Sequence, residues 1–491
     1  MPDDVRVLRL GDMMLRREGT LTRRFVQVVF SVALRLFFRR IETSGARLVP
    51  ETGALIFVLN HPNGLIDAAL VFCALPRRIS FLAKSTLFHL PLVGFFLRAA
   101  ETLPLYRRVD EGADMTQNSR TFEACRALLR RGRCIALFPE GVSHNVPRLM
   151  PVKTGAARIA LGALSIGEAV ATTNGPAGAS SDATGETSPR SFDLRIVPVG
   201  LYYTSKTTFR SEALLRFGRP VEVRPVAFDV DGERSRAAVK ELSARIETAL
   251  LDVTLNADTE EQLEVARHAE KLFSSIYEGI NIERSLTARF DFLRRFVARR
   301  VIIGQEERSS AHVENLRRRI LSYEEELRRI GVAPENLSLS RHSGWYVLRH
   351  FLLRAALILA LSPLSFVGAA LHLPAYLFST LIARSFTRHG IDEARATIKI
   401  LLAIILMPLT WLVVAGLCFY FFNWRAGVAG IPLSVLCGYV ALRSLEALYD
   451  MRGWFKAVLL LFNRRQLFLR LLFERRALHQ EIGEIEQGSR D

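Results

Sequence analysis

A histidine and an aspartate stand six positions apart in the segment NHPNGLID, which covers residues 60–67 and follows a short apolar run. Proline, asparagine and glycine favour a turn, so we expect His61 to enter a cleft at the carboxyl end of a strand. A carboxylate can fix the tautomer of a neighbouring histidine and stabilise the imidazolium that forms when the ring accepts a proton. His61 and Asp67 are therefore a candidate general base and its partner, although Asp67 could instead cap the next helix.

The spacing of this pair sets a structural condition. Six positions along a continuous helix would turn the two side chains about 240° apart, on different faces. His61 and Asp67 can therefore meet only if the residues between them form a turn, for which Pro62 and Gly64 are suited.

A second block, FPEGVSH, covers residues 138–144 and also follows an apolar run. We expect Glu140 to enter the cleft, and Ser143 belongs to the same block. Gly141 would let the backbone approach a ligand closely. The alternative is an ordinary turn at the end of a strand.

Two further candidate blocks contain neither a histidine nor a carboxylate. PLYRR ends an apolar run with Arg107 and Arg108, whose guanidinium groups suit bidentate binding of phosphate, although a surface salt bridge is a common alternative. IVPVG, at residues 196–200, has no reactive group. Pro198 can therefore only shape a wall or a backbone contact.

These blocks follow short apolar runs that alternate with helical patterns between residues 46 and 250. The alternation predicts an α/β domain, which we expect to be a mixed sheet flanked by helices. Within it, residues 165–191 are rich in Gly, Ser, Thr and Ala and predict a flexible surface insertion. Residues 251–345 predict a charged helical region. The predicted strands are 54–59, 79–83, 103–106, 134–138, 194–203 and 214–223.

Composition narrows the class of partner. The chain has 491 residues, with 66 Lys and Arg against 49 Asp and Glu, a formal net charge of +17 and 49% apolar residues. The charge indicates nucleic acid, an anionic membrane surface or a phosphorylated substrate, and the high apolar content favours a membrane over nucleic acid. The five cysteines show no CxxC pair and no metal-ligand spacing, so we expect packed, reduced thiols and no metal site.

Long uncharged runs predict membrane helices. Residues 400–422 carry no charge over 23 positions, enough to cross a hydrocarbon core of roughly 30 Å, and residues 426–442 add a second run. Residues 355–383 are interrupted by two prolines and predict a broken span or a re-entrant hairpin. We therefore assign residues 346–443 to membrane-embedded helical hairpins.

Both ends of the chain predict helices that lie in the membrane interface. Residues 1–45 contain a predicted helix at 21–41, for which packing on its own domain is the alternative. Residues 444–491 predict a basic amphipathic tail. The polar stripe of the first helix comprises Arg24, Gln27, Ser31, Arg35 and Arg39.

Taken together and in chain order, NHPNGLID, PLYRR, FPEGVSH and IVPVG resemble the four motifs of the glycerophospholipid acyltransferase family, in particular its glycerol-3-phosphate acyltransferase branch. The resemblance covers roughly residues 25–250. The commonest family pattern leaves four residues between the histidine and the aspartate, whereas five separate His61 from Asp67. One branch with a His-Pro-Asn or His-Ala-Asn start tolerates the extra residue.

The resemblance implies a mechanism. His61 would remove a proton from a glycerol hydroxyl, which attacks an acyl thioester, and Asp67 would orient His61. Arg107 and a second cation, Arg108 or Lys153, would hold the phosphate of the acceptor.

The same resemblance gives roles to the remaining blocks. Glu140 and Gly141 would position the acceptor, with Ser143 in the same motif, and the strand around Pro198 would line the side of the acyl donor. The co-substrate would be acyl-CoA or acyl-carrier protein, with no cofactor, metal ion or covalent acyl-enzyme required.

We expect glycerol 3-phosphate to be the acceptor, giving lysophosphatidic acid in phospholipid synthesis. 1-Acylglycerol 3-phosphate (lysophosphatidic acid) or dihydroxyacetone phosphate is the alternative acceptor within the same chemistry. A non-catalytic membrane scaffold is a remoter alternative, against which intact His61, Asp67 and Glu140 count. Anionic membrane lipids are a further expected partner, and nucleic acid is not.

The catalytic domain of this integral membrane protein is expected on the cytoplasmic face. Asp3 and Asp4 make the amino terminus a poor signal peptide, and positively charged loops favour the cytoplasm. Residues 384–399 and the tail are basic, so both should share a side with the catalytic domain. That arrangement requires residues 355–383 to enter the membrane and return.

Overall fold

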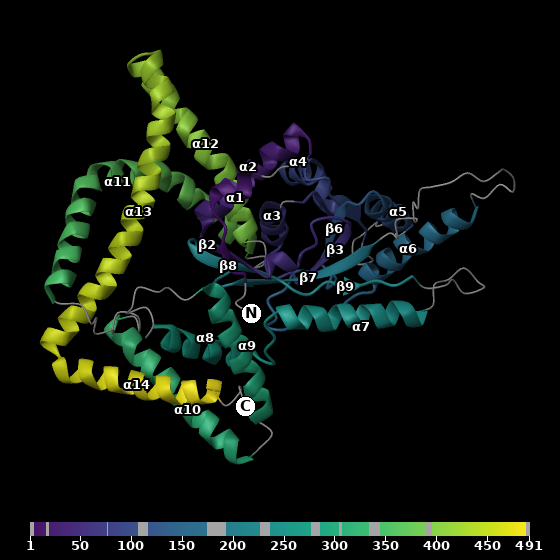
Figure 1. Cartoon of the computed structure of the whole chain (residues 1–491). Coiled ribbons are helices and arrows are strands. Elements are labelled where there is room, and N and C mark those ends of the chain that lie inside the picture. Colours follow the sequence, from purple (N-terminus) through teal and green to yellow (C-terminus); the bar gives the residue numbers. More distant parts are fainter. Residues whose placement is uncertain are drawn as a thin grey trace, which may run out of the picture. The chain divides into compact units, whose positions relative to one another are not determined.

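The chain forms two compact units, residues 1–255 and 256–491, and each is described by itself. Figure 1 shows a sheet with its helices in the first unit and a series of long helices in the second. The computed structural model describes residues 4–15, 19–75, 77–106, 116–173, 193–225, 236–275, 285–303, 307–332, 344–387 and 395–487.

The first unit is built on a nine-stranded mixed sheet with the order β1-β2-β8-β7-β3-β6-β4-β5, and β9 pairs with β7. Its centre is parallel, because β3 lies between β6 and β7 and runs parallel to both. β8 returns antiparallel to β7, whereas β2 is parallel to β8. The strands are β1 (Arg6–Val7), β2 (Phe38–Ser44), β3 (Ala54–Leu59), β4 (Ile79–Lys84), β5 (Leu103–Leu105), β6 (Cys134–Leu137), β7 (Leu194–Tyr203), β8 (Ser211–Phe217) and β9 (Val221–Glu222).

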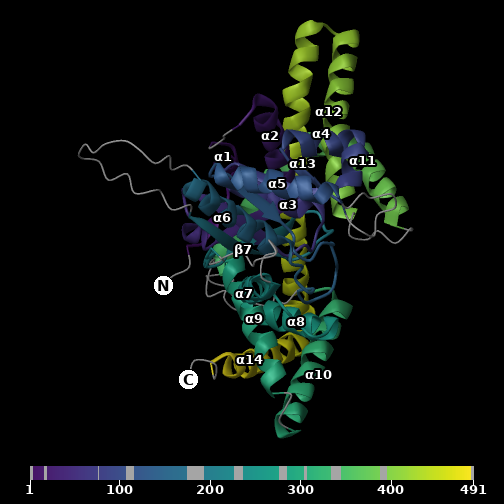
Figure 2. The ribbon, with the colours of Figure 1, turned by 90° about the vertical axis from the view of Figure 1, so that its right-hand side faces the viewer.

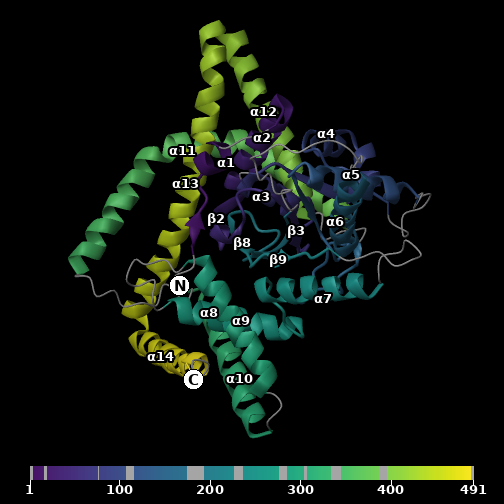
Figure 3. The ribbon, with the colours of Figure 1, turned by 45° about the vertical axis from the view of Figure 1, so that its right-hand side comes forward.

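Helices cover both faces of this sheet. α5, α6 and α7 pack against β6, β3 and β7, and Figures 1, 2 and 3 show α2 and α3 on the face opposite α7. The α/β prediction with a mixed sheet is therefore confirmed. The helices are α1 (Leu10–Leu15), α2 (Leu21–Phe37), α3 (Leu65–Ala74), α4 (Pro91–Ala99), α5 (Gln117–Arg130), α6 (Gly155–Thr173) and α7 (Arg236–Val253), with 3₁₀ turns at Ala46–Leu48 and Ser85–His89.

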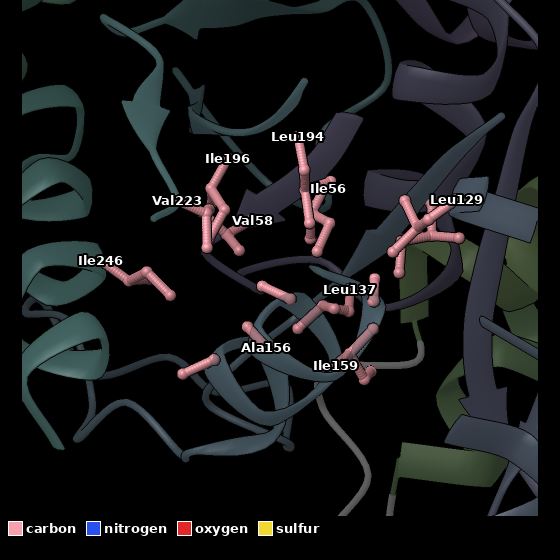
Figure 4. Close-up of a cluster of buried hydrophobic side chains, with 14 of the residues drawn as sticks. Ile56, Val58, Leu129, Leu137, Ala156, Ile159, Leu194, Ile196, Val223 and Ile246 are labelled. Atoms are coloured by element: carbon pink, nitrogen blue, oxygen red, sulfur yellow. The ribbon is translucent and has the colours of Figure 1, made fainter. Parts of the chain in front are cut away.

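The main apolar core lies between the sheet and the helices α5, α6 and α7. Ile56 and Val58 point into it from β3 and meet Ile159 from α6 and Ile246 from α7 (Figure 4). All six residues of β3 are buried, as expected for a parallel strand whose two faces are both covered. This central strand is the rigid support from which the NHPNGLID segment departs.

Five predicted strands coincide with β3, β4, β5, β6 and β7 to within one residue at either end. The sixth prediction, 214–223, covers part of β8 and all of β9. In the predicted insertion, residues 165–173 belong to α6, and residues 174–191 lie outside the described residues.

The first helix is shorter than predicted, because α2 ends at Phe37 and β2 begins at Phe38. Arg210 terminates the helix: its backbone N–H donates to the Phe37 carbonyl at 2.7 Å, and its side chain donates to the Arg35 carbonyl at 3.2 Å. The following residues pair with β8, beginning with Phe38 opposite Ser211. Pairing with a distant strand therefore decides the end of this helix.

The predicted polar stripe on this helix is not an exposed surface. Gln27 and Ser31 are buried, and the Gln27 side-chain amide donates to the Phe72 carbonyl at 3.4 Å. Carbonyl groups at the ends of neighbouring helices need donors, so α2 turns part of its polar side inward. Its exposed large apolar residues are Leu21, Phe25, Val32 and Leu36.

In the second unit, α14 packs with α8, α9 and α10. The Arg319 guanidinium on α10 donates to the Glu481 carboxylate on α14 at 2.5 Å, and the Phe273 ring on α8 stacks on His479 at 4.6 Å between centroids. The carboxyl-terminal helix is thus fixed to a helical bundle, whereas we expected an interfacial tail. These helices are α8 (Glu260–Ser275), α9 (Leu286–Ile303), α10 (Glu307–Ile330) and α14 (Arg465–Gln487).

Three helices between α10 and α14 are long and apolar enough to cross a membrane: Phe351–Ser385 in α11, Thr397–Phe421 in α12 and Trp424–Ala457 in α13. They confirm the prediction of membrane helices in this part of the chain. The full elements are α11 (Gly344–Thr387), α12 (Arg395–Phe421) and α13 (Trp424–Asn463).

Two boundaries in this region differ from the prediction. α11 is one continuous helix with Pro363 and Pro374 inside it, so the expectation of a helical hairpin over residues 355–383 is wrong. Proline removes one backbone donor and kinks a helix without ending it, and Figures 1 and 3 show α11 bending along its length. α13 continues past Arg443, which forms an ion pair with Glu446 along the helix surface.

Candidate active site

The segments that follow β3 and β6 meet at one edge of the sheet, because these strands are parallel neighbours and their carboxyl ends lie side by side. The backbone N–H of His144 donates to the His61 carbonyl at 3.2 Å, and the backbone N–H of Gly64 donates to Ser143 Oγ at 3.2 Å. NHPNGLID and FPEGVSH therefore form one site, as their positions after two strands predict.

His61 and Asp67 form the predicted pair. His61 Nδ1 lies 2.9 Å from Asp67 Oδ2. An ionised carboxylate only accepts hydrogen bonds, so His61 Nδ1 carries the proton and Nε2 is left as an acceptor. The Asp67 side chain is fully buried, whereas that of His61 is 19% exposed. The histidine can thus be reached by a substrate, and the aspartate cannot.

A turn brings the pair together, as their six-residue spacing requires. Gly64 has a φ of +55°, which glycine adopts without steric cost, and α3 begins at Leu65 so that Asp67 lies in its first turn. The Asn63 backbone N–H donates to Asp67 Oδ2 at 2.7 Å. Asp67 therefore supports both the turn and the histidine.

Packing also fixes the orientation of the His61 ring. It stacks on Phe138, the first residue of the second block, with 3.8 Å between ring centroids and 15° between the planes. Together with the bond to Asp67, this stacking defines where His61 Nε2 points. Preorganisation of a base in this way lowers the cost of reaching the reactive geometry.

The Glu140 carboxylate accepts hydrogen bonds from groups inside the protein. Its side chain is fully buried. Oε1 accepts the His61 backbone N–H at 2.9 Å, and Oε2 accepts the Met150 backbone N–H at 2.8 Å and an imidazole hydrogen bond from His144. Both oxygens are engaged, so Glu140 ties the two blocks together rather than presenting a free carboxylate to an acceptor.

Gly141 and Lys153 lie against each other. Gly141 has a φ of +77°, and a Cβ at this position would lie 2.4 Å from Lys153 Nζ. The Lys153 backbone N–H donates to the Pro139 carbonyl at 2.9 Å. The lysine side chain therefore crosses over the glycine, which places an ammonium group next to the FPEGVSH backbone.

Pro198 lies away from this pair of blocks. Pro198 is buried within β7 opposite Val58, and its ring faces Gly218, so it belongs to the sheet interior. Arg107 and Arg108 lie outside the described residues; β5 ends at Leu105.

Tyr203, Lys206 and Asn145 also belong to the site and were not predicted. The Tyr203 hydroxyl donates to Asp67 Oδ1 at 2.6 Å. Lys206 Nζ donates to the His144 carbonyl at 3.3 Å and to Asn145 Oδ1 at 3.0 Å. Tyr203 follows IVPVG in the segment IVPVGLYY, and a strand ending at the same sheet edge was the signal that could have indicated it.

Burial sets the state of two side chains in this unit. Burial and the neighbouring Asp67 carboxylate raise the pKa of Tyr203 well above its ordinary value, so its hydroxyl stays protonated and donates. Burial raises the pKa of the Cys125 thiol to about 12. The thiolate is the nucleophilic form of cysteine, so Cys125 is a packed side chain rather than a nucleophile.

Comparison with known proteins agrees with this geometry. The acyltransferase family model matches residues 40–201, and the model of the glycerol-3-phosphate acyltransferase 2 C-terminal domain matches residues 275–487. The chain is 25% identical over 312 residues to glycerol-3-phosphate O-acyltransferase 2 of Saccharomyces cerevisiae, across 61% of this chain and 38% of the yeast protein. It therefore matches well under half of that relative's length.

Two further similarities extend the comparison. An uncharacterized acyltransferase of Schizosaccharomyces pombe is 24% identical over 90% of this chain and 76% of its own length. The crystal structure of the 1-acyl-sn-glycerophosphate acyltransferase of Thermotoga maritima superposes with a TM-score of 0.31 and 17% identity, over 48% of this chain and 84% of that one. On the two family models and the relatives, the chain belongs to the glycerophospholipid acyltransferase family, in its glycerol-3-phosphate acyltransferase branch.

Proposed function

We propose that this chain transfers a fatty acyl group from acyl-CoA or acyl-carrier protein to glycerol 3-phosphate, giving lysophosphatidic acid. The observation that carries the proposal is the His61–Asp67 pair, with Nδ1 of the histidine bonded to the buried carboxylate and the ring partly exposed. Family membership supplies the reaction class. The yeast relative is named for this acceptor, and that name is the reason to prefer glycerol 3-phosphate.

The chemistry is a direct transfer. His61 Nε2 takes the proton of a glycerol hydroxyl as the oxygen attacks the thioester carbonyl. A C–O bond forms, the C–S bond breaks, and the imidazolium returns the proton to the departing thiolate. Asp67 stabilises the imidazolium in between. The step needs no cofactor and no acyl-enzyme.

The acceptor phosphate is recognised by cationic side chains. Lys153 Nζ lies over Gly141, next to the block that carries Glu140. Arg107 and Arg108 complete the proposed phosphate site, since arginine binds phosphate through two parallel hydrogen bonds. Glu140 and Ser143 act by holding the His61 turn in place, which follows from their hydrogen bonds.

One assay separates the acceptors. Purified full-length protein with labelled acyl-CoA and a panel of glycerol 3-phosphate, dihydroxyacetone phosphate and lysophosphatidic acid should acylate glycerol 3-phosphate fastest. Arg107→Ala should raise the KM for glycerol 3-phosphate strongly and affect lysophosphatidic acid less, because the latter is also delivered by its acyl chain. Robust acylation of lysophosphatidic acid with none of glycerol 3-phosphate would refute the acceptor assignment and leave the reaction class standing.

The chain is membrane-bound through its second unit, and the packing within that unit restricts its topology. α14 is fixed to α10 and α8 by the Arg319–Glu481 pair and by the Phe273–His479 stack, so both ends of the intervening segment lie on one side of the membrane. The number of crossings between them is therefore even. The α12–α13 hairpin supplies two, so the continuous helix α11 must lie along the membrane without crossing it.

The basic residues of the segment 384–399 and those in α14 then share the cytoplasmic face with the catalytic domain, in keeping with the positive-inside rule. The exposed apolar residues Leu21 and Phe25 of α2 would contact the same membrane surface, with anionic lipids facing Arg24. Single cysteines placed at residues 390, 423 and 488 should be labelled from the same side at 390 and 488 and from the other side at 423. Labelling of 390 and 488 from opposite faces would reject this topology.

A further inference from the structure

We propose that Tyr203 is a positioning residue of this reaction: its hydroxyl holds the Asp67 carboxylate in the orientation that makes His61 a base. The inference rests on the proposed acyl transfer for its role. Its geometry is independent of the identity of the acceptor.

Asp67 is a fully buried carboxylate whose two oxygens have different donors. Oδ2 receives His61 Nδ1 at 2.9 Å and the Asn63 backbone N–H at 2.7 Å, whereas Oδ1 receives the Tyr203 hydroxyl at 2.6 Å. A buried charge without donors is costly, and hydrogen bonds to charged groups are stronger than neutral ones. The tyrosine therefore supports the oxygen that the turn and the histidine do not reach.

The position of Tyr203 is fixed by three elements. It is the last residue of β7 and pairs with Ala213 of β8. Its ring stacks on Phe38 of β2, with 5.7 Å between centroids. The Asn60 side chain exchanges two hydrogen bonds with the Leu201 backbone, at 3.1 and 2.7 Å, which continues the β3–β7 pairing past the end of β3. These contacts together hold the Tyr203 ring against Asp67.

The hydroxyl has two consequences for His61. It prevents the carboxylate from rotating about its Cβ–Cγ bond, which keeps Oδ2 aligned with Nδ1. It also draws negative charge toward Oδ1. Without it, the charge would concentrate on the oxygen bonded to His61 and favour the protonated ring, which cannot accept a proton from the acceptor. The tyrosine itself remains protonated, because burial and Asp67 raise its pKa.

Other ionisable groups surround the pair and stay in place when the hydroxyl is removed. Glu140 accepts the His61 backbone N–H, and His144 bonds to Glu140. Lys206 lies on the loop after β7, where its carbonyl accepts the Asn63 side-chain amide at 3.2 Å. A change in the pH dependence of His61 in a Tyr203 variant can therefore be assigned to the hydroxyl.

The test is Tyr203→Phe in the full-length chain, which keeps the ring and its stacking on Phe38. Two quantities are measured across a pH series: acyl transfer to glycerol 3-phosphate, and modification of His61 by diethyl pyrocarbonate, which reacts with the neutral ring, followed by mass spectrometry. We expect kcat to fall about tenfold or more, the KM for glycerol 3-phosphate to change less than about twofold, and the midpoint of His61 modification to move to higher pH. Tyr202→Phe is the matched control, because alternate residues of a strand face opposite sides of the sheet.

The two readouts separate two kinds of failure. If the parent chain transfers no acyl group but the modification midpoint still moves in Tyr203→Phe, the positioning role stands and the proposed function is rejected. An unchanged midpoint in Tyr203→Phe overturns the inference, whatever happens to turnover, since loss of activity alone is what a merely structural role would give. A shift of equal size in Tyr202→Phe would also overturn it.

Discussion

The two units of this molecule place polar side chains inside for different reasons. In the first unit, the buried carboxylates of Asp67 and Glu140 are each held by three donors at the edge of the sheet. In the second unit, only 6% of the apolar stretch of α11 and of α12 is buried within the protein. The hydrogen bond described between these two helices joins two uncharged side chains, Trp411 and His372.

His372 on α11 is the clearest example of the second kind. Trp411 Nε1 on α12 donates to His372 Nε2 at 2.9 Å, and the Gly368 carbonyl lies 2.8 Å from His372 Nδ1. Both bonds are made only by the neutral ring, with the proton on Nδ1. The buried carboxylate at the sheet edge therefore orients a partly exposed histidine, whereas the neutral pair in an apolar surrounding joins two helices. α2 combines both patterns, with buried polar groups and an exposed apolar face.

The largest expected effect comes from removing the base in the first unit. His61→Ala should lower acyl transfer about 10³-fold, because the proton of the acceptor hydroxyl then has no positioned acceptor. Expression and membrane insertion should be unaffected, since insertion depends on the second unit. Near-normal turnover of the purified variant, measured with labelled acyl-CoA, would disprove the mechanism.

A smaller effect on substrate binding is expected at Gly141. Gly141→Ala places a methyl group where Lys153 Nζ lies, so the lysine must move and the KM for glycerol 3-phosphate should rise about tenfold. The left-handed backbone should also cost about 1 kcal/mol of stability. KM is measured in the acyl-transfer assay, and stability by denaturant unfolding.

Gly132 provides the matched control. Its φ is +69°, and a Cβ there would meet nothing within 4 Å. Gly132→Ala should lose similar stability with an unchanged KM. Equal rises of KM in the two variants would show that backbone strain, and not the displaced lysine, weakens binding.

In the second unit, the corresponding substitution should affect stability alone. His372→Leu removes the bond from Trp411, and hydrogen bonds between membrane helices contribute about 0.6 kcal/mol on average. We expect a loss of about that size in detergent-unfolding experiments, with kcat unchanged. Ser362→Ala is the control on the same helix, because Ser362 bonds only to the Leu359 carbonyl of its own helix. A fall in kcat for His372→Leu would break the distinction between the two units.

The smallest effect, on stability, is expected at an ion pair outside the candidate active site. Burial raises the pKa of Glu101, but hydrogen bonds and charge from Arg78 and Arg133 outweigh it, so the net pKa lies below its ordinary value of 4.5. A depressed carboxyl pKa contributes stability that is present above the unfolded value and is lost as pH falls through the folded value. Glu101→Gln should therefore lower the melting temperature of the chain by about 2 °C at pH 7, with the difference shrinking as the pH is lowered through the depressed pKa of Glu101. A constant difference across this range would exclude the ionic explanation.

The local sequence was sufficient for the elements whose apolar pattern and turn chemistry agree. β3 and β7 were predicted at their observed bounds, because short, mostly apolar runs bounded by turn residues indicate buried strands. The meeting of His61 and Asp67 across a turn also followed from Pro62 and Gly64. The long uncharged runs predicted helices that the structure places at α11, α12 and α13.

Only the tertiary structure decided the partners that lie far apart in the chain. The bond between Tyr203 and Asp67 joins residues separated by 136 positions, and it exists because β7 is placed beside β3. From the sequence, Glu140 was expected to enter the cleft. In the structure, both of its carboxylate oxygens accept hydrogen bonds, because the two blocks pack together. The end of α2 at Phe37 depends on β8, and the return of α14 to α10 depends on the intervening helices. Periodicity encodes which side of an element is apolar, but the order in which elements pack determines which polar groups meet.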